Sequence, residues 1–270
     1  MSTHKISRVG IIGLGAIGRR VLDALQARHL PLASYAALNH AADVDGYAKG
    51  HKVELFTEVQ QLIDWKPDLV IECAGHSAVV HAVPAFLNAG IGVVSASVGA
   101  LADKVLAAEL GETAQSGGAR LILVAGAMGG LDAIRSARCA GLDEVLYIGR
   151  KPPKAWVGTP AEEEFDLDQI KVPTTIFRGT AAHASIRFPK NANVTAAVAL
   201  SGVGFDDTQV ELIADPTVAK NVHEVSARGA FGELSIRLVN NPLPDNVKTS
   251  WLAALSIEEA ISKQLLSTVF

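Results

Sequence analysis

Cysteine is scarce in this sequence, and the two thiols, Cys73 and Cys139, each stand alone in their local sequence. This scarcity excludes a disulfide framework and any zinc site built from paired cysteines. The sequence also lacks the His-x-x-x-His and Glu-x-x-His pairs that are typical of metal sites. We therefore expect no bound metal.

Long apolar runs and blocks of one charge are missing as well. No apolar run reaches the ~18 residues that a membrane span needs, and the opening MSTHKISRVGIIG lacks the features of a secretory signal. The 24 basic and 28 acidic residues leave a formal net charge of −4 without a basic block, which argues against a nucleic-acid partner. We expect a cytoplasmic protein that acts on a small molecule, with neither nucleic acid nor membrane as partner.

The 270 residues are 49% apolar and 19% charged, which is enough to bury a sizeable core and excludes intrinsic disorder. The length favours one large domain or two that share a core. Short, continuously apolar runs in the first half are typical of strands covered on both faces of a parallel sheet. They are Val9–Ile12, Ala33–Leu38, Leu69–Cys73, Gly92–Ser95 and Leu121–Val124.

Stretches with helical spacing separate these runs, for example 78–89 and 101–116. Alternating strands and helices predict an α/β fold with a Rossmann-type, doubly wound parallel sheet in residues 1–125. After about residue 140 the strands become longer and more alternating, which predicts a second, α+β domain with a mainly antiparallel sheet in 126–244. We expect residues 245–270 to form a C-terminal helix that packs back on the first domain.

The predicted strands of this second domain are 145–149, 174–179, 184–188, 209–214 and either 223–230 or 232–238. A helix is expected over 191–202, where Val194, Ala197 and Val198 fall on one side.

A glycine-rich turn gives the sharpest local signal. Gly13, Gly15 and Gly18 have the G-x-G-x-x-G spacing directly after a strand and at the start of a helix. The three glycines suit a tight turn, a close approach of backbone to a pyrophosphate, and close packing of helix on strand. Because unpaired N–H groups and the positive end of the helix dipole favour phosphate there, we expect a dinucleotide site that includes Ala16 and Ile17.

The coenzyme is expected to be NAD or NADP. Asn39 follows the second strand, where an acidic side chain would bind the ribose hydroxyls and repel a 2′-phosphate. An asparagine can bind ribose without that repulsion, so NADP is expected to be tolerated beside NAD; the alternative is that Asn39 only caps a turn. The turns with Ala74 and Gly75 and with Ser97 are expected to line the same groove. Cys73 is expected to be inert packing rather than a nucleophile.

Two polar clusters mark the second half, each just before a helix. FPKNANV at 188–194 and NNPLPDNVKTS at 240–250 suit either ordinary capping or the binding of anionic groups. Among the eight histidines, His183 and His223 belong to this half, and the residue pattern alone does not choose between them.

The chain resembles the L-aspartate dehydrogenase family. The resemblance rests on GLGAIG at 13–18, VAGAMGGLDAI at 124–134, FPKNANV, His223 and NNPLPDNVKTS, and it runs over essentially the whole chain. It implies NAD(P)-dependent oxidative deamination of L-aspartate to iminosuccinate or oxaloacetate and ammonia. It further implies that His223 is catalytic and that Ala127 and Asn193 contact the coenzyme.

Hydride leaves only from a neutral amine, so this reaction needs a base near the substrate amine. The two carboxylates of the substrate also need a cation. His223 is assigned the first role, and Lys190, Lys248 and Thr249 are candidates for the second. Alternatives are a dihydrodipicolinate- or homoserine-type dehydrogenase, or a protein that senses NAD(H) without turnover. We expect a homodimer, with the exposed face of the second sheet as its interface; the product could serve pyridine nucleotide biosynthesis or amino-acid catabolism.

Overall fold

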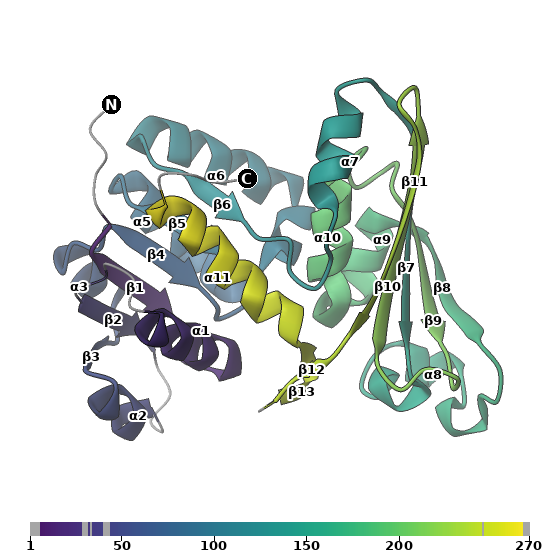
Figure 1. The fold of residues 1–270 in the computed structure, drawn as a ribbon, viewed down its shortest axis with the longest axis horizontal. Coiled ribbons are helices and arrows are strands. Elements are labelled where there is room, and N and C mark those ends of the chain that lie inside the picture. Colours follow the sequence, from purple (N-terminus) through teal and green to yellow (C-terminus); the bar gives the residue numbers. More distant parts are fainter. Residues whose placement is uncertain (1–5, 29–31, 33, 40–43, 245, 267–270) are drawn as a thin grey trace. The chain divides into compact units, whose positions relative to one another are not determined.

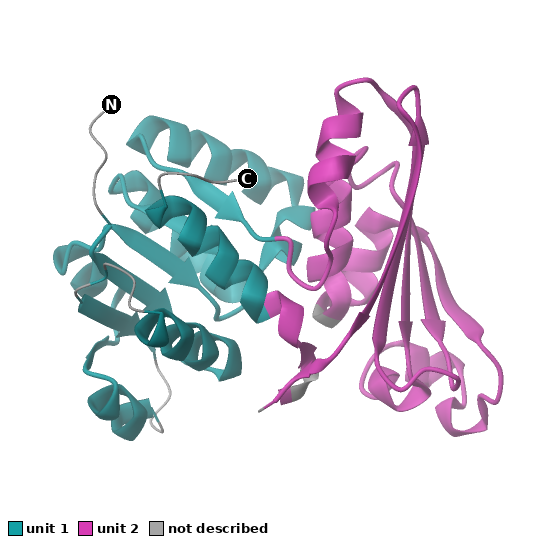
Figure 2. Cartoon of the chain, viewed as in Figure 1, with its two compact units in different colours: residues 1–124, 254–270 teal, residues 125–253 magenta. Residues whose placement is uncertain are grey.

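The computed structural model describes residues 6–28, 32, 34–39, 44–244 and 246–266, without the side chains of Lys190, Val247 and Lys248. Figure 1 shows the fold, and Figure 2 colours the two compact units into which the chain divides. Unit 1 comprises residues 1–124 and 254–270, and unit 2 comprises residues 125–253. The second unit is thus inserted into the sequence of the first.

Unit 1 is built on a six-stranded parallel sheet with the order β3-β2-β1-β4-β5-β6 (Figure 1). The order reverses at β1, which is the doubly wound pattern. The expected Rossmann-type fold is confirmed. The strands are β1 (Arg8–Ile12), β2 (Ser34–Leu38), β3 (Val53–Phe56), β4 (Leu69–Glu72), β5 (Gly92–Ser95) and β6 (Leu121–Leu123).

Helices connect these strands because each parallel crossover must return the chain across the sheet. They are α1 (Ala16–Ala27), α2 (Asp45–Gly50), α3 (Val59–Asp64), α4 (His76–His81), α5 (Val83–Asn88), the 3₁₀ helix η2 (Val98–Ala102) and α6 (Lys104–Gly117). The Asp103 side chain begins α6 by accepting from the backbone N–H groups of Val105 and Leu106.

The last helix, α11 (Trp251–Leu265), returns to unit 1 and begins later than the expected residue 245, because Asn246–Ser250 form a strand. Its apolar residues Ile257 and Ile261 are fully buried in the same core cluster as Leu22 of α1 and Ile11 of β1. Glu258, 1% exposed, accepts a hydrogen bond of 2.6 Å from the Arg28 guanidinium. The first sheet therefore has a core that the C-terminal helix helps to form.

Unit 2 contains a five-stranded sheet with the order β11-β10-β7-β9-β8, in which only β7 and β9 are parallel. Helices α7 (Leu131–Arg138), α9 (Ala181–Arg187) and α10 (Ala192–Ser201) cover one face (Figure 1). The expected mainly antiparallel second sheet is confirmed. Its strands are β7 (Leu142–Lys151), β8 (Thr174–Thr180), β9 (Gln209–Ala214), β10 (Asn221–Gly229) and β11 (Gly232–Asn240).

Smaller elements complete this unit. They are α8 (Ala161–Glu164), the hairpin of β12 (Pro242–Leu243) and β13 (Asn246–Ser250), and the 3₁₀ helices η3 (Pro153–Trp156), η4 (Leu167–Gln169) and η5 (Pro189–Asn191).

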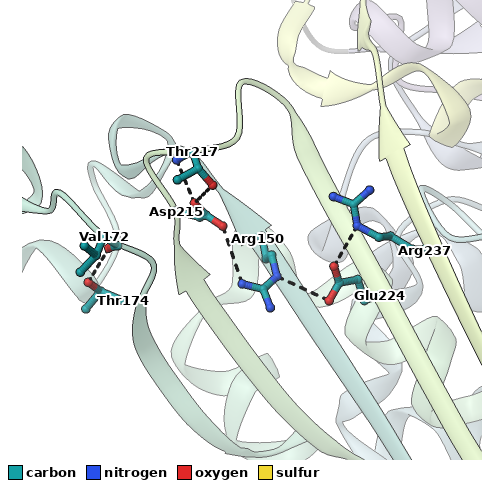
Figure 3. A network of polar contacts seen from close by, with 7 residues as sticks. All are labelled: Arg150, Val172, Thr174, Asp215, Thr217, Glu224 and Arg237. Atoms are coloured by element: carbon teal, nitrogen blue, oxygen red, sulfur yellow. Dashed lines mark hydrogen bonds and ion pairs between the residues drawn. The ribbon is translucent and has the colours of Figure 1, made fainter.

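The face of this sheet opposite the helices carries paired charges. Glu224 of β10 lies between Arg150 of β7 and Arg237 of β11, with N–O distances of 3.5 and 3.1 Å (Figure 3). Asp215 lies 3.7 Å from a second nitrogen of Arg150. Cross-strand pairs of opposite charge suit a sheet face that has no helix on it.

Several boundaries differ from those expected from the sequence. The stretch 184–188, expected as a strand, lies largely in α9, since the Thr180 hydroxyl caps a helix start by accepting from His183 N at 3.4 Å. The helix expected over 78–89 is divided at Ala82, just before Pro84. Strand β3 was missed because Glu54 interrupts its short apolar run.

Candidate functional site

The glycine-rich turn joins β1 to α1 in unit 1. Gly13 has φ +89°, and a Cβ there would lie 2.8 Å from Cβ of Ala74. A Cβ on Gly18 would lie 2.0 Å from the carbonyl oxygen of Gly13. Both positions therefore require glycine, the first for its backbone conformation and the second because helix and turn touch.

Gly15 differs from its two neighbours because a Cβ there would meet nothing within 4 Å. Gly15 is the N-cap of α1, which has neither a side-chain cap nor an acidic residue in its first turn. Among the described residues, no side chain accepts from the N–H groups of Ala16 and Ile17 in that turn. This open, electropositive helix start fits the pyrophosphate of a dinucleotide.

Asn39 is hydrogen-bonded to the glycine-rich turn. Its Oδ1 accepts from Leu14 N at 3.1 Å, while the carbonyl of Leu38 accepts from Gly13 N at 3.0 Å. The end of β2 is thereby fixed against the glycine turn, which is the place where a ribose would follow the pyrophosphate. The structure thus brings together Gly13, Asn39 and Ala74, three of the residues predicted for the coenzyme.

Glu72, at the end of β4, is a residue of this edge that the sequence analysis missed. Its carboxylate is fully buried and accepts five hydrogen bonds of 2.8–3.1 Å. The donors are Ala74 N, Gly75 N, Ser95 Oγ, Ser97 N and Ser97 Oγ. One carboxylate therefore holds both turns that were predicted to line the coenzyme groove. The sequence signal that could have identified Glu72 is an acidic residue at the end of the otherwise apolar run LVIE at 69–72.

Cys73 follows Glu72, and its surroundings do not favour a nucleophilic thiolate. Burial raises the pKa of its thiol above the usual range, and the neighbouring charge of Glu72 raises it further. A thiolate is the reactive form of cysteine, so this environment disfavours reactivity and agrees with the predicted packing role.

His223 is a buried titratable residue of unit 2. It is 4% exposed, on β10, and its Nδ1 lies 2.8 Å from the Tyr147 hydroxyl. Its Nε2 is buried without a hydrogen-bond partner among the described residues. Burial, together with the charge of Lys151, lowers the pKa of His223 to about 3, so the ring is neutral at physiological pH.

Gly149 makes the contact between Tyr147 and His223 geometrically feasible. It is the Cα partner of His223 in the β7–β10 ladder, two residues from Tyr147 on the same strand. A Cβ at Gly149 would lie 2.9 Å from the Tyr147 hydroxyl oxygen. The missing side chain leaves space in which the hydroxyl reaches the imidazole.

Lys151, the last residue of β7, is the second functional candidate that sequence reasoning missed. Its Nζ donates to Oδ1 of Asn191 and lies 5.2 Å from the centre of the Trp156 ring. Burial lowers its pKa to about 8. The FPKNANV stretch therefore contributes Asn191 to a cationic site beside His223, a role that its letters alone did not reveal.

The GAMGG turn begins unit 2. The carbonyl oxygen of Ala127 accepts from Asn240 Nδ2 at 2.7 Å, and Gly130, at φ +72°, lies against Ile236 of β11. Asn193 lies on α10 and is exposed. The predicted coenzyme contacts Ala127 and Asn193 thus lie on different elements of unit 2, the first held by β11.

Of the three residues predicted to hold the substrate, Thr249 is half-buried on β13. The side chains of Lys190 and Lys248 lie outside the described residues. Within the described ranges no group of three or more metal-ligating side chains occurs. In the same part of the chain, no helix has the length and apolarity that a membrane crossing requires.

Two family models match the chain. Residues 132–264 match the C-terminal region of aspartate dehydrogenase, and residues 13–124 match the NAD-binding domain of homoserine dehydrogenase. An L-aspartate dehydrogenase of Cupriavidus necator is 44% identical over 263 residues, which is 95% of this chain and 97% of that protein. One from Ruegeria pomeroyi is 44% identical over 261 residues, with 95% and 92% covered.

Solved structures agree with these matches. Aspartate dehydrogenase from Thermotoga maritima has a TM-score of 0.79 and 26% identity, covering 99% of this chain and 100% of that one. An archaeal homoserine dehydrogenase in complex with NADPH, at 12% identity and a TM-score of 0.60 with 98% and 99% covered, shares the fold. From these matches and the site geometry, the chain belongs to the L-aspartate dehydrogenase family of NAD(P)-dependent oxidoreductases.

Proposed function

We propose that the protein oxidatively deaminates L-aspartate with NAD or NADP, giving iminosuccinate and then oxaloacetate and ammonia, with His223 as the acid–base group. The observation that carries this proposal is the buried, unpartnered Nε2 of His223. A buried polar atom without a partner is costly. Such an atom is therefore expected in a binding site, where a ligand supplies the missing hydrogen-bond partner.

The glycine turn is proposed to hold the coenzyme. Gly13, Gly15, Ala16, Ile17 and Gly18 would bind the pyrophosphate at the start of α1, and Asn39 the adenosine ribose. A bound NAD or NADP supplies a hydride acceptor for the Cα of L-aspartate. Further proposed coenzyme contacts are Ala74, Gly75, Ser97, Ala127 and Asn193.

His223 is neutral in the free protein, so Nε2 can accept a proton, but a pKa of about 3 makes the free ring a weaker base than a histidine that titrates near neutral pH. For Nε2 to accept a proton from the substrate ammonium, Nδ1 must carry the ring proton and donate it to the Tyr147 oxygen. Since burial also keeps the Tyr147 phenol protonated by raising its pKa, this hydroxyl is a stable partner. The proton held on Nε2 can then pass to the departing ammonia when water has added to the imine.

The proposal is tested by following the absorbance of NADH and NADPH with oxaloacetate plus ammonia, and separately with L-aspartate and each oxidised coenzyme. Coenzyme-dependent turnover in either direction is expected. Coenzyme binding without turnover would favour a sensor of NAD(H). Turnover of homoserine, or of the dihydrodipicolinate reductase substrate, but not of L-aspartate would favour the related dehydrogenases.

The homodimer and the cytoplasmic location stay predictions. The charged sheet face around Glu224 is the proposed dimer interface. Sedimentation velocity on the wild type and on a Glu224→Lys variant would test it. A monomeric wild type would reject the dimer, and an unchanged dimer in the variant would place its interface elsewhere.

A further inference from the structure

Lys151 is a cation with no counter-charge among the described residues. The side chain is half-buried, and among the described residues its ammonium makes no ion pair with any carboxylate. Its neighbours are neutral: the amide oxygen of Asn191 and the face of Trp156. Both stabilise a positive charge without cancelling it.

The preceding residue shows how the same strand treats an ordinary cation. Arg150 points to the opposite face of the sheet, where Asp215 and Glu224 lie 3.7 and 3.5 Å from its nitrogens (Figure 3). Adjacent positions of β7 thus carry one cation with two carboxylate partners and one with no carboxylate partner in the described part of the chain. Charges that are withdrawn from water are normally paired, so the half-buried Lys151, unpaired within the described ranges, is suited to a partner that binds from outside the chain.

His223 provides an independent sign of a ligand at the same place. Its Nε2 is buried and unpartnered, and Lys151 is close enough to contribute to the lowering of the His223 pKa. With a pKa of about 8, Lys151 itself is still mostly charged at neutral pH. Among the described residues, an ammonium without an anion thus lies near an imidazole whose Nε2 has no hydrogen-bond partner.

We propose that Lys151 binds one carboxylate of the dicarboxylic substrate and so places the substrate amine at Nε2 of His223. This inference rests on the proposed function. It assigns the carboxylate-binding role to Lys151, whereas the sequence suggested Lys190 and Lys248. L-Aspartate fits the pair, since it carries carboxylates for the ammonium and an amine for the imidazole. Asn191 holds the ammonium in place as a positioning residue.

The substrate role and a purely structural role predict opposite effects on stability. If Lys151 only supported the fold through Asn191 and Trp156, the Lys151→Met variant would unfold at lower temperature. If Lys151 serves the substrate, methionine removes a desolvated charge from the free protein. The variant should then be at least as thermostable as the wild type while binding the substrate more weakly.

The experiment uses the NADH-loaded protein and succinate, a four-carbon dicarboxylate without an amine, as calorimetric probe. In Lys151→Met the Kd for succinate and the KM for L-aspartate should rise about 10- to 100-fold, the effect of losing a charge-assisted hydrogen bond. Lys151→Arg should recover part of this loss because it keeps the charge. The Kd for NADH should be unchanged, as should all parameters of Lys154→Met, which removes an exposed lysine three residues away.

The outcomes separate the two proposals. If the wild type oxidises L-aspartate but Lys151→Met keeps its KM and succinate affinity, the inference is overturned and the proposed function stands. If the wild type does not oxidise L-aspartate, the proposed function fails, and the succinate titration still reports whether Lys151 binds a carboxylate. A variant that loses succinate and NADH affinity together, with a lowered Tm, would show a structural role and reject the inference.

Discussion

The Tyr147 hydroxyl lies 2.8 Å from Nδ1 of His223, across the bare backbone of Gly149. In the proposed mechanism Nδ1 donates to this hydroxyl, which leaves Nε2 free to accept a proton, so the contact should control the activity of the histidine. Gly149→Ala should displace the hydroxyl, and Tyr147→Phe should remove it. We expect both variants to lower kcat by about tenfold, the effect of one lost hydrogen bond, with little change in the KM for NADH.

Steady-state kinetics on both variants would check this, with the Kd for NADH as the folding control. Equal kcat in wild type and Tyr147→Phe would show that the hydroxyl has no part in orienting the ring.

Replacing His223 tests the proton transfer itself. His223→Asn keeps a polar side chain of similar reach but cannot accept a proton at neutral pH. We expect kcat to fall by ~10²–10⁴-fold, the usual contribution of a positioned acid–base group. Fluorescence titration should show that NADH still binds. His183→Asn, a change on α9, is the matched control, and unchanged turnover in His223→Asn would reject the assignment.

Glu72 should support both coenzyme binding and stability. In Glu72→Gln an NH₂ group replaces one oxygen, so an N–H donor such as that of Ser97 or Ala74 loses its acceptor. The unfolding free energy should fall by about 1–3 kcal/mol, the cost of an unsatisfied buried group, and the KM for NADH should rise several-fold. Chemical denaturation of this variant and of Glu54→Gln, at an exposed position on β3, measures the difference. Equal losses of unfolding free energy in the two variants would contradict the stabilising role of the Glu72 carboxylate.

Asn39 is expected to set the coenzyme preference. Asn39→Asp retains Oδ1, which accepts from Leu14 N, and adds a negative charge where the ribose is predicted to lie. The added charge should repel a 2′-phosphate, so kcat/KM with NADPH should fall at least about tenfold relative to NADH, a difference of about 1.4 kcal/mol. An unchanged ratio would place the ribose away from Asn39.

Lys151 should make stability depend on pH in the alkaline range. Burial lowers its pKa from 10.5 to about 8 in the folded protein, so between these values the unfolded chain binds more protons than the folded one. Stability contributed by this group therefore rises as pH increases from 8 to 10.5. Chemical denaturation should show the unfolding free energy of the wild type increasing relative to that of Lys151→Met as the pH rises over this range. A constant difference would mean that the ammonium is hydrated in the folded state.

Much of the fold was predictable because its signals are local. The glycine spacing at 13–18 and the apolar parallel strands need only neighbouring residues to be recognised, and both appear as expected. Glu72 and Lys151 were missed for a physical reason. Each carries a charge whose meaning depends on partners distant in sequence, such as Ser97 for Glu72 and Asn191 for Lys151. The stretch 184–188 was assigned wrongly because its apolar pattern suits a strand and a helix equally.

The late arrival of α11 has a consequence for synthesis of the chain. Ile257 and Ile261 complete the core that Ile11 and Leu22 begin, so a nascent chain that has emerged only as far as residue 250 exposes an apolar groove on its first sheet. Unit 2 is contiguous in sequence and can close while still on the ribosome. The core of unit 1 therefore cannot be completed until Ile257 and Ile261 have left the ribosome.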